Sequence, residues 1–285
     1  MRNFLLFLIL FAVSIGMQAQ DKEGIDQCQF AAIYDYSIST LDHEGKAVRD
    51  EMKLMVQVGR TMTKSMPLSE AVSTDTYKMD ENYEKNKIVS VYNEAKMHMP
   101  TVWIGYPEGM TTVREYMCPY LFEGSEPTPN IAWILLEDTM SIGGFLCLRA
   151  TATFRGVDWQ VWYTEEIPSS AGPWRLRGLP GLIVKAEGGA HTFCLAELRQ
   201  EEAAITQPEL NPDVERVKYD KYLKHKNKLY GNRLYPNNPI YHISKLTDYV
   251  KEVFVFGFGE ERYSFANSMY PLLTKSHVYQ PLELK

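Results

Sequence analysis

The chain has 285 residues, of which 45% are hydrophobic and 23% charged, and its formal charge is −6 at pH 7. This length is sufficient for one large domain or two small ones whose core needs no cross-links. The mildly acidic balance argues against a nucleic-acid-binding surface, which should be basic.

The first 19 residues have the pattern of a secretory signal peptide. A short n-region containing Arg2 precedes an apolar run over 4–15, and Ala19 is the small residue at the expected cleavage point. The run is shorter than the roughly 20 residues of a membrane-spanning helix, which favours cleavage over an uncleaved anchor. We therefore expect a mature chain that is free in the periplasm or the medium, with no transmembrane segment.

Strict alternation of apolar and polar residues predicts two strands joined by a turn at 42–45. The inward face of the first strand consists of Phe30, Ala32, Tyr34, Tyr36 and Ile38. The inward face of the second consists of Met52, Leu54, Val56 and Val58. These two segments should form an antiparallel hairpin.

Further strands are expected at 87–92, 97–104, 111–117, 130–137, 145–155 and 159–167, with a short helix or loop at 66–77. Many short strands separated by turns favour a mostly β fold, a curved antiparallel sheet or open half-barrel with one or two peripheral helices. We assign this β domain to residues 20–200.

The pattern changes in the extension 201–285. Asn211 and Pro212 can begin a helix and Gly231 can end it, which predicts a helix over 213–230. A loop at 235–239 and a strand at 253–258 should follow. We expect the whole extension to pack on the same domain.

The segment 159–183 has an unusual local order of a strand, a Gly/Pro connection and a sharp turn. Pro180 and Gly181 suit the second and third positions of a type II turn, because that turn needs a positive φ at its third position. Gly172 and Gly178 indicate places where a backbone or the face of Trp162 or Trp174 approaches closely.

The hexapeptide Gly178–Ile183 resembles the motif of the GLPGLI family, secreted proteins of Gram-negative bacteria. The resemblance extends upstream to Cys147, more loosely to Trp133, and covers roughly residues 28 to 200. One departure is Val157, at a position that is often basic in the family. The resemblance implies a secreted β protein, and the family offers no established activity to carry over.

The four cysteines, Cys28, Cys118, Cys147 and Cys194, are widely spaced. They form no C-x-x-C pair, which argues against a structural zinc site. In an oxidising compartment we expect one or two disulfides, for which three complete connectivities exist. The alternative is that they are small buried thiols.

Two groups of residues are candidates for ligand binding. Trp162 and Trp174, with Gly178, Pro180 and Gly181, form one wall of a pocket in the first interpretation and only lock a corner of the fold in the second. Arg149 and Arg155 share a predicted strand face. They either bind an anionic ligand or form ion pairs, with Glu165 and Glu166 as the expected partners.

The sequence contains no G-x-S-x-G, H-E-x-x-H, P-loop or dinucleotide motif, so we assign no catalytic residue, metal ligand or cofactor. The leading hypothesis is non-enzymatic binding of a hydrophobic or peptide-like ligand or of an envelope partner. One alternative is a secreted hydrolase with a dispersed site of Arg149, Arg155, Glu165 and His191. Another is a copper-handling protein that uses Met97, His98, Met99, Met110 and Met117.

Overall fold

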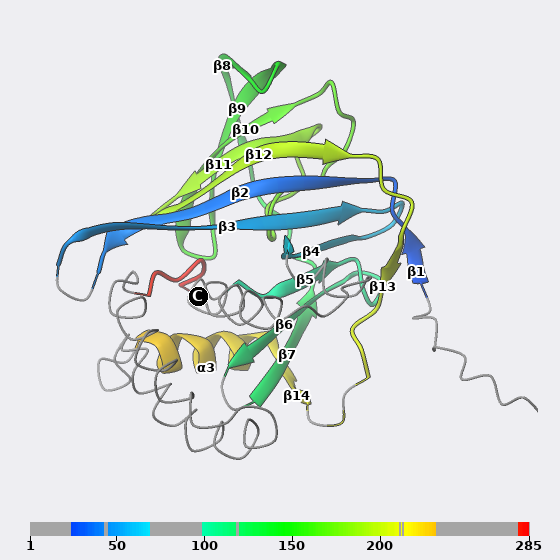
Figure 1. Cartoon of the computed structure of the whole chain (residues 1–285), viewed down its shortest axis with the longest axis vertical. Helices are drawn as coiled ribbons and strands as arrows, with labels where there is room; N and C mark the ends of the chain where they lie inside the picture. Colours follow the sequence, from blue (N-terminus) through cyan, green and yellow to red (C-terminus); the bar gives the residue numbers. More distant parts are fainter. Residues whose placement is uncertain are drawn as a thin grey trace, which may run out of the picture.

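A 12-stranded, strongly curved sheet that is open at both edges dominates the computed structural model of the chain (Figure 1). The structure describes residues 24–42, 45–68, 99–117, 120–210, 212, 214–231 and 279–284. In their order across the sheet the strands are β14 (Val214–Lys218), β7 (Tyr120–Pro127), β6 (Met110–Met117), β5 (Thr101–Ile104), β4 (Thr63–Pro67), β3 (Ala47–Val58), β2 (Phe30–Leu41), β12 (His191–Arg199), β11 (Leu182–Gly188), β10 (Val157–Thr164), β9 (Phe145–Phe154) and β8 (Ile134–Ile142).

Neighbouring strands of this sheet are antiparallel except β14 and β7, which are parallel. A separate antiparallel pair is formed by β1 (Gly24–Gln27) and β13 (Ala204–Thr206). The helix α3 (Tyr219–Gly231) lies alongside β7 and β14. The predicted class, a mostly β fold with a curved open sheet, is confirmed.

The hairpin of β2 and β3 forms as the alternation predicts. Tyr34, Tyr36 and Leu54 point into the core and are at most 1% exposed. Asp35 and Lys53 face each other on the opposite side of the sheet, and their side chains form an exposed ion pair of 2.6 Å. Period-2 patterning therefore assigns both faces correctly, because successive side chains of a strand point to opposite sides.

The predicted helix over 213–230 is wrong at its N-terminal end. Val214–Lys218 form β14, and α3 begins only at Tyr219. Hydrogen bonds to β7, a strand that the sequence pattern does not predict, outweigh helix propensity here. Gly124 of β7 makes room for α3, since a Cβ at this position would lie 2.8 Å from the Cβ of Tyr222.

The core lies on the concave face of the sheet. Its largest fully buried aromatic side chains are Trp159, Trp174, Tyr34, Tyr36, Tyr222 and Phe193. Full burial of a large apolar side chain contributes about 1.5–3 kcal/mol, so these rings are a major part of the stability. The protein's own side chains thus fill the curved sheet.

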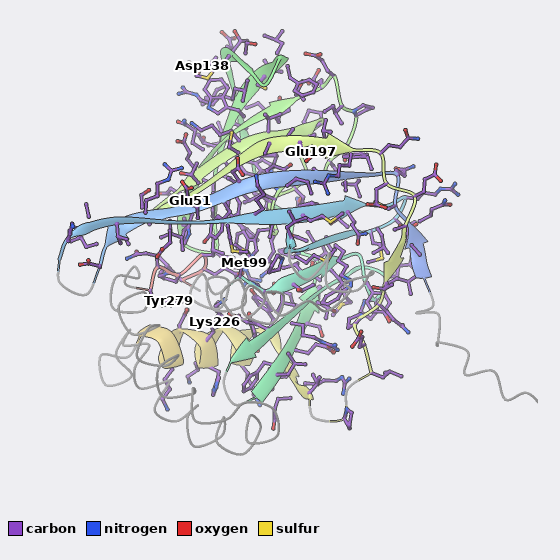
Figure 2. The ribbon with its side chains drawn as sticks, viewed as in Figure 1. Glu51, Met99, Asp138, Glu197, Lys226 and Tyr279 are labelled. Carbon is purple, nitrogen blue, oxygen red and sulfur yellow. The ribbon has the colours of Figure 1, made fainter. Side chains whose placement is uncertain are left out.

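The segment Tyr279–Leu284 also packs inside the curve of the sheet, beside α3 (Figures 1 and 2). The Leu284 N–H donates to the carbonyl oxygen of Arg155 over 2.8 Å. The Tyr279 hydroxyl donates to Asn227 of α3 over 3.1 Å. This segment therefore connects the helix to the β9–β10 turn.

No helix within the described ranges has the length and apolar character that spanning a membrane requires. Several predicted segments lie outside the described residues: the signal peptide 1–19, most of the helix or loop 66–77, the strand 87–92, the loop 235–239 and the strand 253–258.

Candidate binding site

The connection between β10 and β11, residues 165–181, contains most of the hexapeptide and is here called the motif loop. The Gly178 N–H donates to the carbonyl oxygen of Ser170 over 2.9 Å. From outside the loop, the indole N–H of Trp133 donates to the carbonyl oxygen of Arg177 over 2.8 Å. The first bond joins two segments of the loop, and the second ties the loop to Trp133, so the backbone at Ser170 and Arg177 is held at both places.

The two glycines of the hexapeptide are required for different reasons. Gly178 has a φ of +96°, which an L residue adopts only with strain. At Gly181 a Cβ would lie 2.0 Å from the carbonyl oxygen of Thr164. Gly181 itself has no positive φ, so the predicted type II turn is wrong. Gly181 is needed because the backbone of β10 passes so close to it.

Gly172 meets the expectation of a close backbone approach. A Cβ there would lie 2.6 Å from the carbonyl oxygen of Leu176 and 2.8 Å from the side chain of Ile183. The motif loop therefore folds back on itself at Gly172. Within this segment Pro168 and Ser170 are exposed, whereas Ala171 and Gly172 are buried.

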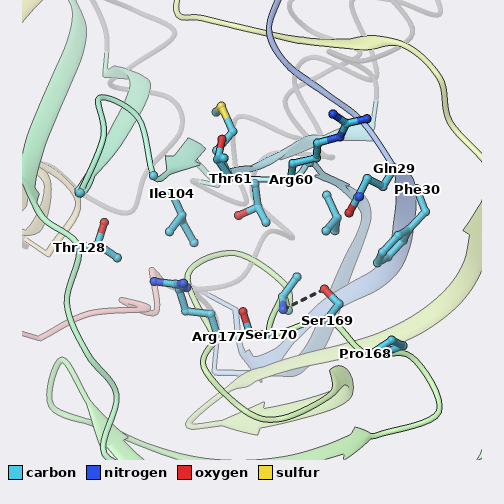
Figure 3. Close-up of a pocket in the computed structure, with 18 residues that line it drawn as sticks. Gln29, Phe30, Arg60, Thr61, Ile104, Thr128, Pro168, Ser169, Ser170 and Arg177 are labelled. Carbon is cyan, nitrogen blue, oxygen red and sulfur yellow. Dashed lines mark hydrogen bonds between the residues drawn. The ribbon is translucent and has the colours of Figure 1, made fainter.

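A cavity of about 470 Å³ lies between the motif loop and two turns of the sheet (Figure 3). The turns are the β3–β4 turn and the β5–β6 turn. The lining residues are Gln29, Phe30, 58–63, Ile104, Gly105, Gly109, Thr128, 168–172 and Arg177. The volume falls within the range of about 300–1,000 Å³ that small-molecule sites have.

The cavity is polar and carries positive charge. Of its 18 lining residues two are arginines, Arg60 and Arg177, and none is acidic. Figure 3 shows the Arg177 side chain beside Ser170 and directed toward Thr128, whereas Arg60 extends outward from the opposite wall. Neither arginine forms an ion pair of 4 Å or less with another residue of the described ranges. The site can therefore donate hydrogen bonds from guanidinium and hydroxyl groups.

Asp26 supports the wall formed by the β3–β4 turn. Its Oδ2 accepts hydrogen bonds from the Thr61 N–H over 2.8 Å, the Thr61 hydroxyl over 3.1 Å and the Met62 N–H over 3.2 Å. Partial burial alone would raise the pKa of Asp26, but these bonds and one from Gln27 outweigh it and lower the pKa. The ionised carboxylate thus fixes the turn that lines the cavity.

Arg175 lies two residues before Arg177 and points into the core, where it is 2% exposed. Its Nη1 donates to both carboxylate oxygens of Glu283 over 2.9 and 3.1 Å, and its Nη2 donates to Glu126. The guanidinium also lies 4.3 Å from the centre of the Tyr219 ring. Burial alone would lower the pKa of Arg175, but Glu283, Tyr219 and Glu126 outweigh it and raise the pKa.

The structure does not place Trp162 and Trp174 on one wall. Trp174 is 1% exposed and packs in the core at 5.9 Å from the ring of Trp159. Trp162 lies on the other face of the sheet, where it clusters with Cys147 and Val184. Both rings are buried among neighbouring side chains.

Arg149 and Arg155 do not share a face. Arg149 pairs with Asp138 over 2.7 Å and lies over the Trp162 ring on the outer side of the sheet. Arg155 lies in the β9–β10 turn with a φ of +53° and forms an ion pair with Glu126 in the interior. The turn breaks the alternation on which the prediction rests. Both arginines form ion pairs, but not with Glu165 or Glu166.

The residues proposed for a dispersed hydrolase site do not converge. His191 is 2% exposed and sits in the core, with Nδ1 at 3.0 Å from the Tyr36 hydroxyl and Nε2 at 3.3 Å from the carbonyl oxygen of Pro281. Glu165 is exposed in the turn after β10, and Arg149 lies on the outer face. The sheet and its turns therefore separate these side chains.

The disulfide prediction is wrong for three of the four cysteines. Cys28, Cys147 and Cys194 are free thiols, and Cys118 lies outside the described residues. Cys147 in β9 and Cys194 in β12 are separated by two strands, or roughly 14 Å at about 4.8 Å per strand spacing. A disulfide needs Cα atoms within about 7 Å. Burial raises the pKa of Cys28 to about 11, which keeps this thiol protonated and unreactive.

The copper alternative depends on residues that are only partly described. Met97 and His98 lie outside the described residues. Met99 is buried in the main core cluster and acts as a packing residue. Within the described ranges, no three His, Cys, Asp or Glu side chains come together in a way that could hold a metal ion.

The candidate residues predicted from the sequence include neither the buried Arg175 nor the cavity residue Arg177. Arg175 and Arg177 are two charged residues in an otherwise apolar motif, which is the one local signal that could have singled them out. Nothing in the sequence relates Thr61 or Thr128 to the motif, because only the curvature of the sheet brings their turns together.

Comparison with known proteins gives a family of unknown function. A family model described as "Protein of unknown function (Porph_ging)" matches residues 154–185, which include the motif loop. No curated protein is matched. Two solved structures of PNGF-II, in space groups P21 and C2, are similar at 14% identity, with TM-scores of 0.48 and 0.42. Each similarity covers 70% of this chain, which spans only about a third (33% and 32%) of the PNGF-II chains.

Proposed function

We propose that the chain is a secreted member of the GLPGLI family that binds a peptide-like ligand, without transforming it, in the cavity beside the motif loop. The signal-peptide pattern of residues 1–19 supports secretion. The hexapeptide Gly178–Ile183 supports the family, and the matched segment 154–185 contains it.

The observation that carries the proposal is the cavity of about 470 Å³ whose wall includes the motif loop. Phe30, Val58 and Ile104 supply apolar surface to it, while threonine and serine side chains supply hydrogen-bonding groups. This mixture suits a ligand with both peptide groups and an apolar side chain. The concave face of the sheet is a poorer candidate, because buried aromatic rings and the segment Tyr279–Leu284 occupy it.

The described residues favour neither alternative activity. Arg149, Glu165 and His191 lie on different faces or at different depths, so they offer no shared point for a substrate. The copper alternative gains no further support from Met99, which is packed in the core. Binding is therefore the function that we advance, with an envelope partner that presents a peptide as one form of the ligand.

The test is native mass spectrometry of protein recovered from its own host, compared with the denatured mass. Ser170 is exposed and lines the cavity, so the Ser170→Trp variant should obstruct it. The matched control is Glu165→Trp, at an exposed position of the same loop that does not line the cavity. We expect an added mass in the wild type and the control that is lost in Ser170→Trp. An added mass that survives in Ser170→Trp would contradict binding in this cavity.

A further inference from the structure

Arg177 brings a positive charge into the cavity and has no carboxylate partner among the described residues. The only charged side chains of the lining are Arg60 and Arg177, in a protein whose formal charge is −6. Unpaired guanidinium groups in an acidic protein form a local positive site, which attracts negatively charged groups. The Arg60 side chain extends away from the cavity in Figure 3, so Arg177 is the positively charged side chain nearest to a ligand inside the cavity.

Three acidic residues near the cavity wall are already bonded to other groups. The carboxylate of Asp26 accepts hydrogen bonds from Thr61 and Met62 in the β3–β4 turn. Glu126 lies two residues before the lining residue Thr128, but one of its carboxylate oxygens pairs with Arg175 and the other with Arg155. Glu283 is likewise bound to Arg175. Glu126 and Glu283 thus belong to the ion cluster around Arg175, Asp26 is bound to the β3–β4 turn, and none of the three forms an ion pair with Arg177.

The position of Arg177 is fixed before any ligand arrives. Its carbonyl oxygen accepts the Trp133 indole N–H, and the neighbouring Gly178 N–H donates to Ser170. A planar guanidinium on a fixed backbone can donate two parallel hydrogen bonds to one carboxylate. The hydroxyl groups of Ser170 and Thr128, which lie on either side of Arg177 in Figure 3, can donate further bonds to the same group.

We propose that the ligand of this cavity carries a carboxylate, and that Arg177 binds it while Phe30 and Ile104 contact an adjoining apolar side chain. The proposal rests on the proposed function, because it names the charged group of that same ligand. A peptide can supply the carboxylate from its C-terminus or from an acidic side chain. Both sources present the same carboxylate group, and a binding experiment can distinguish them.

Three probes distinguish these cases in calorimetric titrations of the mature protein. N-acetyl-alanyl-leucine has a free C-terminal carboxylate, its amide has none, and N-acetyl-glutamyl-leucine amide has one on the side chain only. Each is titrated into the wild type, Arg177→Gln, Arg177→Lys and Arg49→Gln. Arg49 is exposed and pairs with Glu51 on β3, away from the cavity, so Arg49→Gln controls for the change in net charge.

The expected result is that at least one carboxylate probe binds the wild type at least about tenfold more tightly than the neutral amide, since a hydrogen bond between two charged groups is stronger than one to a neutral group. Arg177→Gln should remove this preference, Arg177→Lys should retain part of it, and Arg49→Gln should leave it unchanged. The preferred carboxylate probe identifies the source.

Two outcomes would overturn the proposal. If the amide binds as tightly as the acids, or if Arg177→Gln keeps the preference, the cavity binds peptides without recognising a carboxylate. The inference then fails while the proposed function stands. If none of the three probes binds the wild type, both fail together. Near-UV circular dichroism of each variant confirms that a lost preference does not come from a lost fold.

Discussion

Arg175 and Arg177 are two residues apart in the same loop, and their surroundings are opposite. Arg175 is buried, and Glu283, Glu126 and the Tyr219 ring surround it. Arg177 lines a cavity without an acidic residue in its lining. The comparison separates a cation that holds the fold together from one that is available to a ligand, although the sequence presents them as equivalent.

The largest expected effect is that of removing Arg175. Arg175→Met keeps most of the volume but leaves the buried Glu283 without its main counter-charge and Glu126 with Arg155 alone, which should lower the free energy of unfolding by about 3–5 kcal/mol. The matched change Arg177→Met should cost no more than about 0.5 kcal/mol. Chemical denaturation of both variants measures this difference. Equal losses would remove the distinction between the two arginines.

A double-mutant cycle sharpens the assignment of Arg175. Removing both partners in Arg175→Met/Glu283→Leu eliminates the uncompensated charge, so the double variant should be more stable than the sum of the single losses predicts, by about 1–3 kcal/mol. The same denaturation measurements supply the coupling energy. A coupling energy near zero would mean that Glu283 does not stabilise Arg175 as the contact implies.

Substitutions of the two glycines of the hexapeptide test how closely the motif loop, which carries Arg177, packs on β10. Gly181→Ala places a Cβ against the β10 backbone, where no side chain can move aside, and should cost about 3 kcal/mol. Gly178→Ala meets no atom closer than 3.9 Å and suffers only backbone strain, about 1–2 kcal/mol. Thermal unfolding with its calorimetric enthalpy ranks the two. A larger loss for Gly178→Ala would contradict the close packing of the motif loop on β10.

The smallest expected effect concerns Asp26, which fixes the wall opposite the motif loop. Because its pKa is lowered in the folded state, its contribution is present above about pH 4 and is lost as the pH falls through the folded-state pKa. Asp26→Asn should therefore cost up to about 1 kcal/mol at neutral pH and progressively less below pH 4. Urea denaturation at several pH values checks this. A loss that is independent of pH would show that the charge of Asp26 is unimportant.

The sequence predicts the sheet better than it predicts the site. Alternating residues such as Tyr34, Tyr36 and Leu54 report which face of a strand is buried, because burial depends on a period of two that is local. β14 is missed because its stability comes from pairing with β7, which is distant in sequence. The same limit applies to the cysteines, whose spacing says nothing about the strands that separate them.

The candidate site illustrates the limit most clearly. The motif loop is visible in the sequence, and the close approach at Gly172 is predicted correctly. The opposite wall of the cavity comes from the β3–β4 turn, more than 100 residues away, and only the curvature of a 12-stranded sheet places it there. Whether Arg175 or Arg177 points inward depends on that three-dimensional arrangement, so the pattern of residues cannot decide it.

The most direct test of the distinction between the two arginines is nuclear magnetic resonance of their side-chain Nε–Hε groups during titration with N-acetyl-alanyl-leucine. The resonances are assigned from the Arg177→Lys and Arg175→Lys variants, each of which lacks one signal. We predict a saturable shift of the Arg177 signal, while the Arg175 signal stays in place because its partners are internal. A stationary Arg177 signal in the presence of bound peptide, or equal shifts of both, would contradict the assignment of Arg177 to the ligand and Arg175 to the fold.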